Sequence, residues 1–205
     1  GYTASDGYTA SDPCSEHDII LKIIHNKISN VKRGLDLPFG APCTKVFLTM
    51  DDNIFSNVSY SWFSTVIYAN NVSGAFLIKN NRIEPSFCSM PPIALSDCDG
   101  PVTIINNRVG IMPMKGDPVL HNAEIKVMTV STVGDVIIAN NSVFGADAYS
   151  SSGWGLLMPL TAEKGNMVIS NNRVEGFSNS KGGGSVYFAV GGKSFTFQNN
   201  QIMGY

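Results

Sequence analysis

Acidic residues that could cleave a glycosidic bond occur at two places in this chain. Asp51 and Asp52 are adjacent, and Glu84 follows in the stretch Arg82-Ile83-Glu84. A hydrolase acting on an acidic polysaccharide needs two carboxyl groups on opposite sides of the scissile bond. The polygalacturonase phrases NTD and GHG are missing around the Asp pair, and RIE differs by one residue from RIK. The pattern gives little support to hydrolysis, and we expect no catalytic residues.

A Ca²⁺-dependent lyase would need several carboxylates and an arginine base on neighbouring segments. Asp52, Asn81 and Asn107 occupy similar positions in successive repeats, so we expect them to align, but they supply one carboxylate. The three histidines are scattered, and no CxxC or Cys/His spacing indicates zinc. We therefore expect neither a metal nor a cofactor.

The four cysteines could form two disulfides. Cys14 and Cys43 are 29 residues apart, which is close to one period of the repeat, so they would stack on adjacent turns. Cys88 and Cys98 both lie in an insertion that a local bridge would close. We expect the pairs Cys14–Cys43 and Cys88–Cys98; the other connectivities and four reduced cysteines remain the alternatives.

Three asparagines begin N-x-[ST] sequons: Asn57, Asn71 and Asn140. Asn57 and Asn71 are the better glycosylation candidates, because Asn140 belongs to an Asn-Asn doublet. Sequons together with an even number of cysteines predict passage through the secretory pathway to the cell surface or the extracellular space.

An Asn-Asn doublet after an alternating apolar run recurs along the chain and must organise these residues. It appears in 73–83, 100–110, 134–145, 165–176 and 192–204, with degenerate copies ending at Asn26 and Asn53. The second residue of each copy is separated from the next by 27, 28, 26, 34, 31 and 28 residues. Seven copies of one repeat fill the chain.

Each copy predicts three short strands and three corners. The segment before the doublet alternates and is rich in β-branched and aromatic residues, which is typical of a strand. Asparagine tolerates the left-handed backbone of a tight corner. A short apolar segment follows the doublet, and a third apolar run occurs at 64–69, 123–130, 154–160 and 185–190.

Turns of this kind bury an apolar face only when they stack on one another. The sequence therefore predicts an all-β, right-handed parallel β-helix of about seven three-strand coils. We expect the second residues of the doublets to form a hydrogen-bonded ladder along the stack. The predicted ladder residues are Asn26, Asn53, Asn81, Asn107, Asn141, Asn172 and Asn200.

A leucine-rich repeat is the rival solenoid, because 102–109 matches LxLxxNxL. Leucine is sparse, however, and the residues between doublets show no helical periodicity. The β-helix is therefore the better prediction.

Charge and hydropathy exclude some partners. The net charge is −2 and no Lys/Arg cluster occurs, which disfavours nucleic acid and anionic membranes. No stretch of about 18 apolar residues is present to span a bilayer. Arg82, Arg108 and Arg173 share the position after the doublet, which predicts a column of cations; we expect a solvated face there rather than a ligand site.

We expect one solenoid over 19–205, preceded by an irregular segment, 1–18, that contains a duplicated GYTASD. The chain stops within a copy of the repeat, so we expect it to be a piece of a longer solenoid or to have its end covered by a neighbour.

The phrases VTIINNRV, VIIANNSV, MVISNNRV and FLIKNNRI resemble those of the dispersed gene family surface proteins of trypanosomatids over residues 19–205. The resemblance implies a very large, glycosylated surface protein, anchored or shed, built of β-helix segments, with an adhesin-like role and no established enzymatic activity. This sequence lacks the family's C-terminal membrane segments, as expected of a fragment.

Two functional hypotheses follow. The first is a non-catalytic extracellular or surface scaffold, adhesin-like, whose partners are neighbouring solenoid segments or protein and glycan ligands. The alternative is a pectin-lyase-like carbohydrate-active enzyme or carbohydrate-binding domain. A carboxylate cluster on one exposed face would favour the second.

Overall fold

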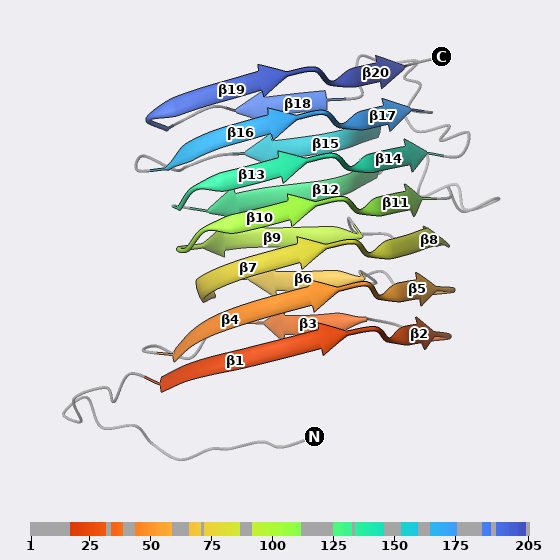
Figure 1. Cartoon of the computed structure of the whole chain (residues 1–205), viewed down its shortest axis with the longest axis vertical. Helices are drawn as coiled ribbons and strands as arrows, with labels where there is room; N and C mark the ends of the chain where they lie inside the picture. The colour runs from red at the N-terminus through yellow and green to blue at the C-terminus, as the bar shows by residue number, and fades with distance from the viewer. Residues whose placement is uncertain are drawn as a thin grey trace.

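The computed structural model describes residues 17–31, 34–38, 44–58, 66–70, 72–86, 92–111, 125–132, 134–145, 153–159, 165–175, 186–189 and 192–203. These residues form three parallel sheets, here called A, B and C, that stack as a parallel β-helix. Figure 1 shows the chain crossing the front in sheet A, continuing into sheet B and returning behind in sheet C while it rises from β1 to β20. This is a right-handed winding, and it confirms the predicted fold class.

Two sheets contain seven strands each and the third contains six. Sheet A consists of β1 (His17–Ile24), β4 (Thr44–Asp51), β7 (Ser73–Lys79), β10 (Val102–Ile105), β13 (Val136–Ala139), β16 (Asn166–Ser170) and β19 (Ser194–Gln198). Sheet B consists of β2 (Lys27–Ser29), β5 (Ile54–Ser56), β8 (Arg82–Ser86), β11 (Arg108–Ile111), β14 (Ser142–Gly145), β17 (Arg173–Glu175) and β20 (Gln201–Met203).

Sheet C consists of β3 (Leu35–Pro38), β6 (Ile67–Asn70), β9 (Ile93–Cys98), β12 (Ile125–Thr132), β15 (Gly153–Pro159) and β18 (Val186–Ala189). Four of its strands, β6, β12, β15 and β18, match the third apolar runs of the sequence, whereas β3 and β9 were not predicted and β9 lies in the segment expected to be an insertion. The seven strands of sheets A and B correspond to the seven copies of the repeat.

Alternation decides which side chains face the interior. In β13, Val136 and Ile138 are buried whereas Ile137 is 40% exposed. The register keeps this pattern in step between coils, because Val136 and Ile138 pair with Val102 and Ile104 on one side and with Met167 and Ile169 on the other. Stacked apolar columns therefore form one continuous core.

A column of glycines marks the entrance to sheet A. Gly74, Gly100, Gly134 and Gly165 stand at matching positions, each two residues before the first buried side chain of its strand. A Cβ added to Gly134 would lie 2.5 Å from the carbonyl carbon of Gly100 and 2.6 Å from its oxygen. The coils approach too closely here for any side chain.

The boundary predicted for the solenoid falls inside β1, because His17 and Asp18 already belong to that strand. The rest of the predicted segment 1–18 lies outside the described residues. Within the described part of the chain, no helix is long and apolar enough to cross a membrane.

Candidate functional site

The inner member of each doublet belongs to an asparagine ladder that runs through all seven coils. From Asn53 onward, the Oδ1 atom of each ladder residue accepts hydrogen bonds from both the backbone N–H and the Nδ2 of the ladder residue one coil earlier. In the middle of the stack, Asn107 donates to Oδ1 of Asn141 from its backbone nitrogen at 2.9 Å and from Nδ2 at 3.1 Å. Asn81 donates to Oδ1 of Asn107 in the same way, at 2.9 and 3.0 Å. The full series is Asn26, Asn53, Asn81, Asn107, Asn141, Asn172 and Asn200, as predicted.

A second set of bonds joins the ladder to the strands of sheet A. Nδ2 of Asn107 also donates to the carbonyl oxygen of Ile78 at 2.9 Å and to that of Ile105 at 3.0 Å. The side chain of Asn107 is 2% exposed. Every polar atom of this amide is therefore bonded within the protein, and the inner asparagines serve the scaffold rather than a ligand.

The outer member of each doublet makes the corner between sheets A and B. All seven of these residues have a positive φ, between 50° and 60°, which is the left-handed conformation that asparagine tolerates better than most residues. They are His25, Asp52, Asn80, Asn106, Asn140, Asn171 and Asn199. His25 is thus a corner residue, as its place in a degenerate doublet indicates.

The predicted alignment of Asp52 with Asn81 and Asn107 is wrong. Asp52 is an outer residue: its neighbour Asp51 pairs with Lys79, which places Asp52 beside Asn80. Asn81 and Asn107 are inner residues of the ladder. The triplet Asp51-Asp52-Asn53 can be aligned with the Asn-Asn doublets in two ways, and only the alignment that places Asn53 inside keeps the ladder continuous.

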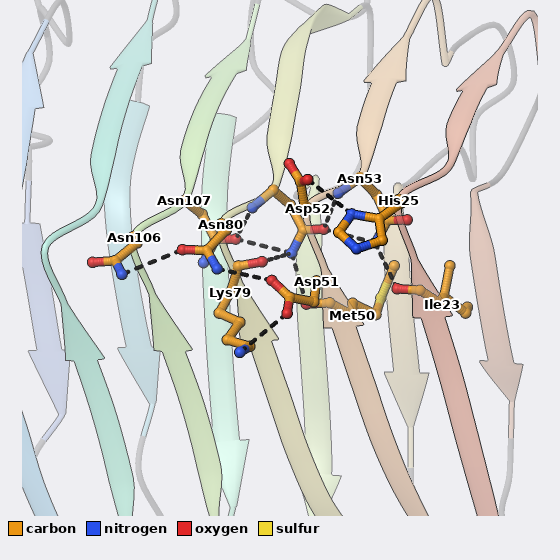
Figure 2. A network of polar contacts seen from close by, with 11 residues as sticks. Ile23, His25, Met50, Asp51, Asp52, Asn53, Lys79, Asn80, Asn106 and Asn107 are labelled. Atoms are coloured by element: carbon orange, nitrogen blue, oxygen red, sulfur yellow. Dashed lines mark hydrogen bonds and ion pairs between the residues drawn. The ribbon is translucent and has the colours of Figure 1, made fainter.

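Figure 2 shows the polar network on the outside of this corner, in the first four coils. Nδ1 of His25 lies 2.9 Å from Oδ2 of Asp52. Asp51 pairs with Lys79, whose Nζ is 3.0 Å from Oδ2, and accepts a hydrogen bond from Nδ2 of Asn80 at 2.8 Å. These side chains lie at the surface, and most of their hydrogen-bonding and charged groups are paired with one another.

The hydrogen bond from Asn80 and the ion pair with Lys79 hold the pKa of Asp51 below its ordinary value. A general acid in glycoside cleavage needs the opposite, because a raised pKa keeps its proton available near neutral pH. Asp51 is therefore a structural anion and is unsuited to protonating a leaving group.

No group of three or more His, Cys, Asp or Glu side chains that could hold a metal ion occurs among the residues for which the structure gives positions.

The predicted arginine column lies on the outer face of sheet B. Arg82 and Arg108 are direct neighbours across β8 and β11, and Ser142 stands between Arg108 and Arg173. Direct stacking of like charges is unfavourable, so each cation would need a local partner.

Each of these arginines has such a partner at the surface. Arg82 lies 3.1 Å from Glu84, and Arg173 lies 2.7 Å from Glu175. The guanidinium of Arg108 stands 5.2 Å from the centre of the Phe144 ring. Compensation on the same face supports the prediction of a solvated surface.

Two of the three sequon asparagines fall in the described residues, and both are exposed. Asn57 has φ 50° and its Nδ2 donates to Oδ1 of Asn30 at 2.5 Å. Asn140 is the outer, exposed member of its doublet, so membership in a doublet does not bury it. Asn71 lies outside the described residues. Of the predicted disulfide partners, Cys98 is buried at the end of β9; Cys14, Cys43 and Cys88 are outside the described part, so both pairings stay predictions.

Sequence reasoning missed a polar stack beside the glycine column. Oγ of Ser73 donates to Asp99 at 2.6 Å. Further up, Asp135 accepts from the backbone N–H of Asn166 at 2.7 Å, and Ser194 donates to Asn166 at 2.9 Å. The sequence did contain a signal for the glycine column beside this stack, because Gly74, Gly100, Gly134 and Gly165 each precede a ladder asparagine by seven residues.

No known protein family, curated protein or solved structure matches this chain.

Proposed function

We propose that this chain is a non-catalytic solenoid segment of an extracellular or cell-surface protein, of the kind that its resemblance to the dispersed gene family surface proteins implies. Its long faces would present glycans and loops to protein or glycan ligands, and neighbouring solenoid segments would extend it. No nucleic acid or membrane is needed as a partner.

The observation that carries the proposal is the use of the repeat's polar residues. The amide groups of the inner asparagines are hydrogen-bonded within the ladder. The surface carboxylates of Asp51 and Asp52 are paired with Lys79 and His25. A repeat whose polar groups mainly bond one another maintains a shape. It does not gather carboxylates around a substrate.

Exposed sequons support the location. Asn57 lies at a corner on the surface, and a glycan attached there would project into solvent. Asn30 occupies the matching corner one coil earlier, also with a left-handed backbone, but it is followed by Val31 and Lys32 and is no sequon. The two residues form a matched pair for an experiment.

The test is the intact mass of native material before and after removal of N-glycans and reduction of disulfides. We expect glycan mass at Asn57 and the proton gain of two reduced disulfides. Production in a eukaryotic secretory host should show the glycan lost in Asn57→Gln and retained in Asn30→Gln. An unmodified, fully reduced native chain would contradict the proposed location.

Incubation with polygalacturonate, with and without Ca²⁺, tests the enzymatic alternative. We expect no cleavage under either condition. Cleavage that disappears in Asp51→Asn would overturn the non-catalytic assignment.

A further inference from the structure

Both sequons that begin within the described residues are built around a buried residue. Val58, the middle residue of Asn57-Val58-Ser59, is 0% exposed and belongs to the hydrophobic core. Asn141, the middle residue of the sequon that begins at Asn140, is 2% exposed and is a member of the asparagine ladder. Each acceptor asparagine is therefore exposed, while the residue that follows it is held inside the solenoid.

The backbone of the second of these sequons is hydrogen-bonded to the coils on both sides of it. The N–H of Asn140 donates to the carbonyl oxygen of Ser170 at 3.0 Å. The N–H of Asn141 donates to Oδ1 of Asn172, also at 3.0 Å. On the other side, the N–H of Ser142 donates to the carbonyl oxygen of the ladder residue one coil earlier at 2.9 Å. All three backbone donors of the tripeptide are thus paired within the protein.

An oligosaccharyltransferase recognises the whole N-x-[ST] tripeptide, so an exposed asparagine amide alone does not make a substrate. To bind the backbone of this sequon, the enzyme has to wait until the three hydrogen bonds have opened. With the usual net contribution of each bond, such an opening lowers the accessible population about ten- to a thousand-fold.

We propose that these two sequons are glycosylated only before their coils close, and that the folded solenoid accepts a glycan at neither asparagine. The proposal deepens the proposed function and rests on it, because a chain meets the transferase only in the secretory pathway. The glycosylated positions are then selected by the interval between synthesis and closure of a coil, and not by exposure in the folded structure.

A glycan attached before closure fits the folded structure. Glycosylation replaces one of the two hydrogens on Nδ2 of an asparagine. Nδ2 of Asn140 donates to no residue that the structure describes, and Nδ2 of Asn57 uses one hydrogen in its bond to Oδ1 of Asn30. The folded chain therefore carries a glycan at either position without losing a described hydrogen bond.

The order of synthesis provides time for modification at Asn140. Two of the three backbone bonds of its sequon lead to the coil of β16 and β17, and Asn172 in that coil follows Asn141 by 31 residues. At about 5–20 residues per second, this segment is made about 1.5–6 s after the sequon. The sequon stays open for at least that interval.

An order-of-addition experiment tests the proposal on the full chain. The unglycosylated chain, carrying Asn71→Gln to remove the third sequon, is diluted from urea into a lipid-linked oligosaccharide. Purified oligosaccharyltransferase is present from the start or is added after circular dichroism shows that refolding is complete. Peptide mass spectrometry should find glycan at Asn57 and Asn140 in the first reaction and at least about tenfold less in the second.

The control is a flexible Gly/Ser tail that carries one Asn-Gly-Ser sequon. This tail should be glycosylated equally in both reactions, because it has no coil to close. Equal occupancy of Asn57 and Asn140 in the two reactions would overturn the proposal. Absence of glycan from both positions in both reactions, while the tail is modified, would overturn it as well.

A matched pair of ladder variants tests whether the bonds of the sequon itself control access. Asn172→Ala removes the acceptor of the Asn141 N–H, whereas Asn81→Ala removes the equivalent acceptor of the Asn53 N–H. After refolding, Asn172→Ala should accept glycan at Asn140 several-fold faster than Asn81→Ala. Equal rates in variants with equal melting temperatures would contradict control by the sequon's own coil, and the order-of-addition result on the unaltered ladder stands if either variant fails to fold.

The timing and the location fail separately. A native chain without glycans would contradict the proposed location. Equal occupancy before and after refolding would contradict the timing, wherever the protein resides.

Discussion

Replacing one inner asparagine tests whether the ladder holds the coils together. In Asn107→Ala, the buried N–H of Asn81 loses the Oδ1 that it reaches at 2.9 Å, and the carbonyl of Ile78 loses a side-chain donor at 2.9 Å but keeps its place in the β7–β10 pairing. Each buried group left without a partner costs about 1–3 kcal/mol. The N–H of Asn81 is the group left without a partner, so the free energy of unfolding should fall by about 1–3 kcal/mol, a sizeable part of the stability of an ordinary domain.

The control is the outer residue of the same doublet. Asn106 is exposed and has φ 57°, and within the described residues its side chain makes one hydrogen bond, from Nδ2 to Oδ1 of Asn80 at 3.3 Å. Glycine adopts this backbone conformation without strain, so Asn106→Gly should change the free energy of unfolding by no more than about 1 kcal/mol.

Urea denaturation followed by circular dichroism measures both variants against wild type, compared at equal m-values. Amide hydrogen exchange locates the effect, because the N–H of Asn81 should lose protection in Asn107→Ala and keep it in Asn106→Gly. Equal stability of the two variants, or protection of Asn81 that survives the loss of the Asn107 amide, would refute the assignment of the ladder as a major stabilising element.

The remaining predictions concern pH and close packing. Asn107→Asp keeps the Oδ1 acceptor but replaces the Nδ2 donor by an oxygen that faces carbonyl groups, which raises the pKa of the new carboxyl group in the folded state. The folded state of this variant therefore binds more protons than the unfolded state. Its urea midpoint should fall as pH rises from 4 to 8, while that of wild type changes less. Gly134→Ala should destabilise the chain by about 1–3 kcal/mol, since the new methyl group meets the backbone of Gly100 at 2.5 Å, and a wild-type melting temperature would contradict this close approach. Asn80→Ala should raise the pKa of Asp51 measured by carboxyl NMR titration, because the hydrogen bond from Asn80 is the largest cause of its lowering; the stability that this bond contributes is present above the unfolded pKa and is lost as pH falls through the folded one.

The sequence was sufficient for the architecture because one signal recurs seven times. A doublet such as Asn140-Asn141 sets a corner and a ladder position together, and the alternation before it sets which side chains are buried. Neither the corner nor the alternation has to be inferred from a single copy, since every copy of the repeat shows the same pattern.

The alignment of Asp52 failed because sequence spacing does not separate the outer member of a doublet from the inner one. The distinction rests on backbone conformation: Asp52 has φ 52°, whereas its neighbour Asn53 is buried in the ladder. The partners of the arginines were also missed, because Phe144 reaches Arg108 from the next coil and Glu84 reaches Arg82 along its own strand. Whether such contacts form depends on which face of the sheet each side chain points to.

The asparagine ladder makes the coils interchangeable. Every step uses the same pair of bonds to Oδ1, although the ladder residues are separated by 26 residues in one step and 34 in another. The extra residues are accommodated away from the ladder, so a whole coil could be duplicated or excised between two ladder asparagines and leave an identical joint behind. Each joint is the same whatever the number of coils before it, as in other solenoid proteins, whose repeats contact only their neighbours.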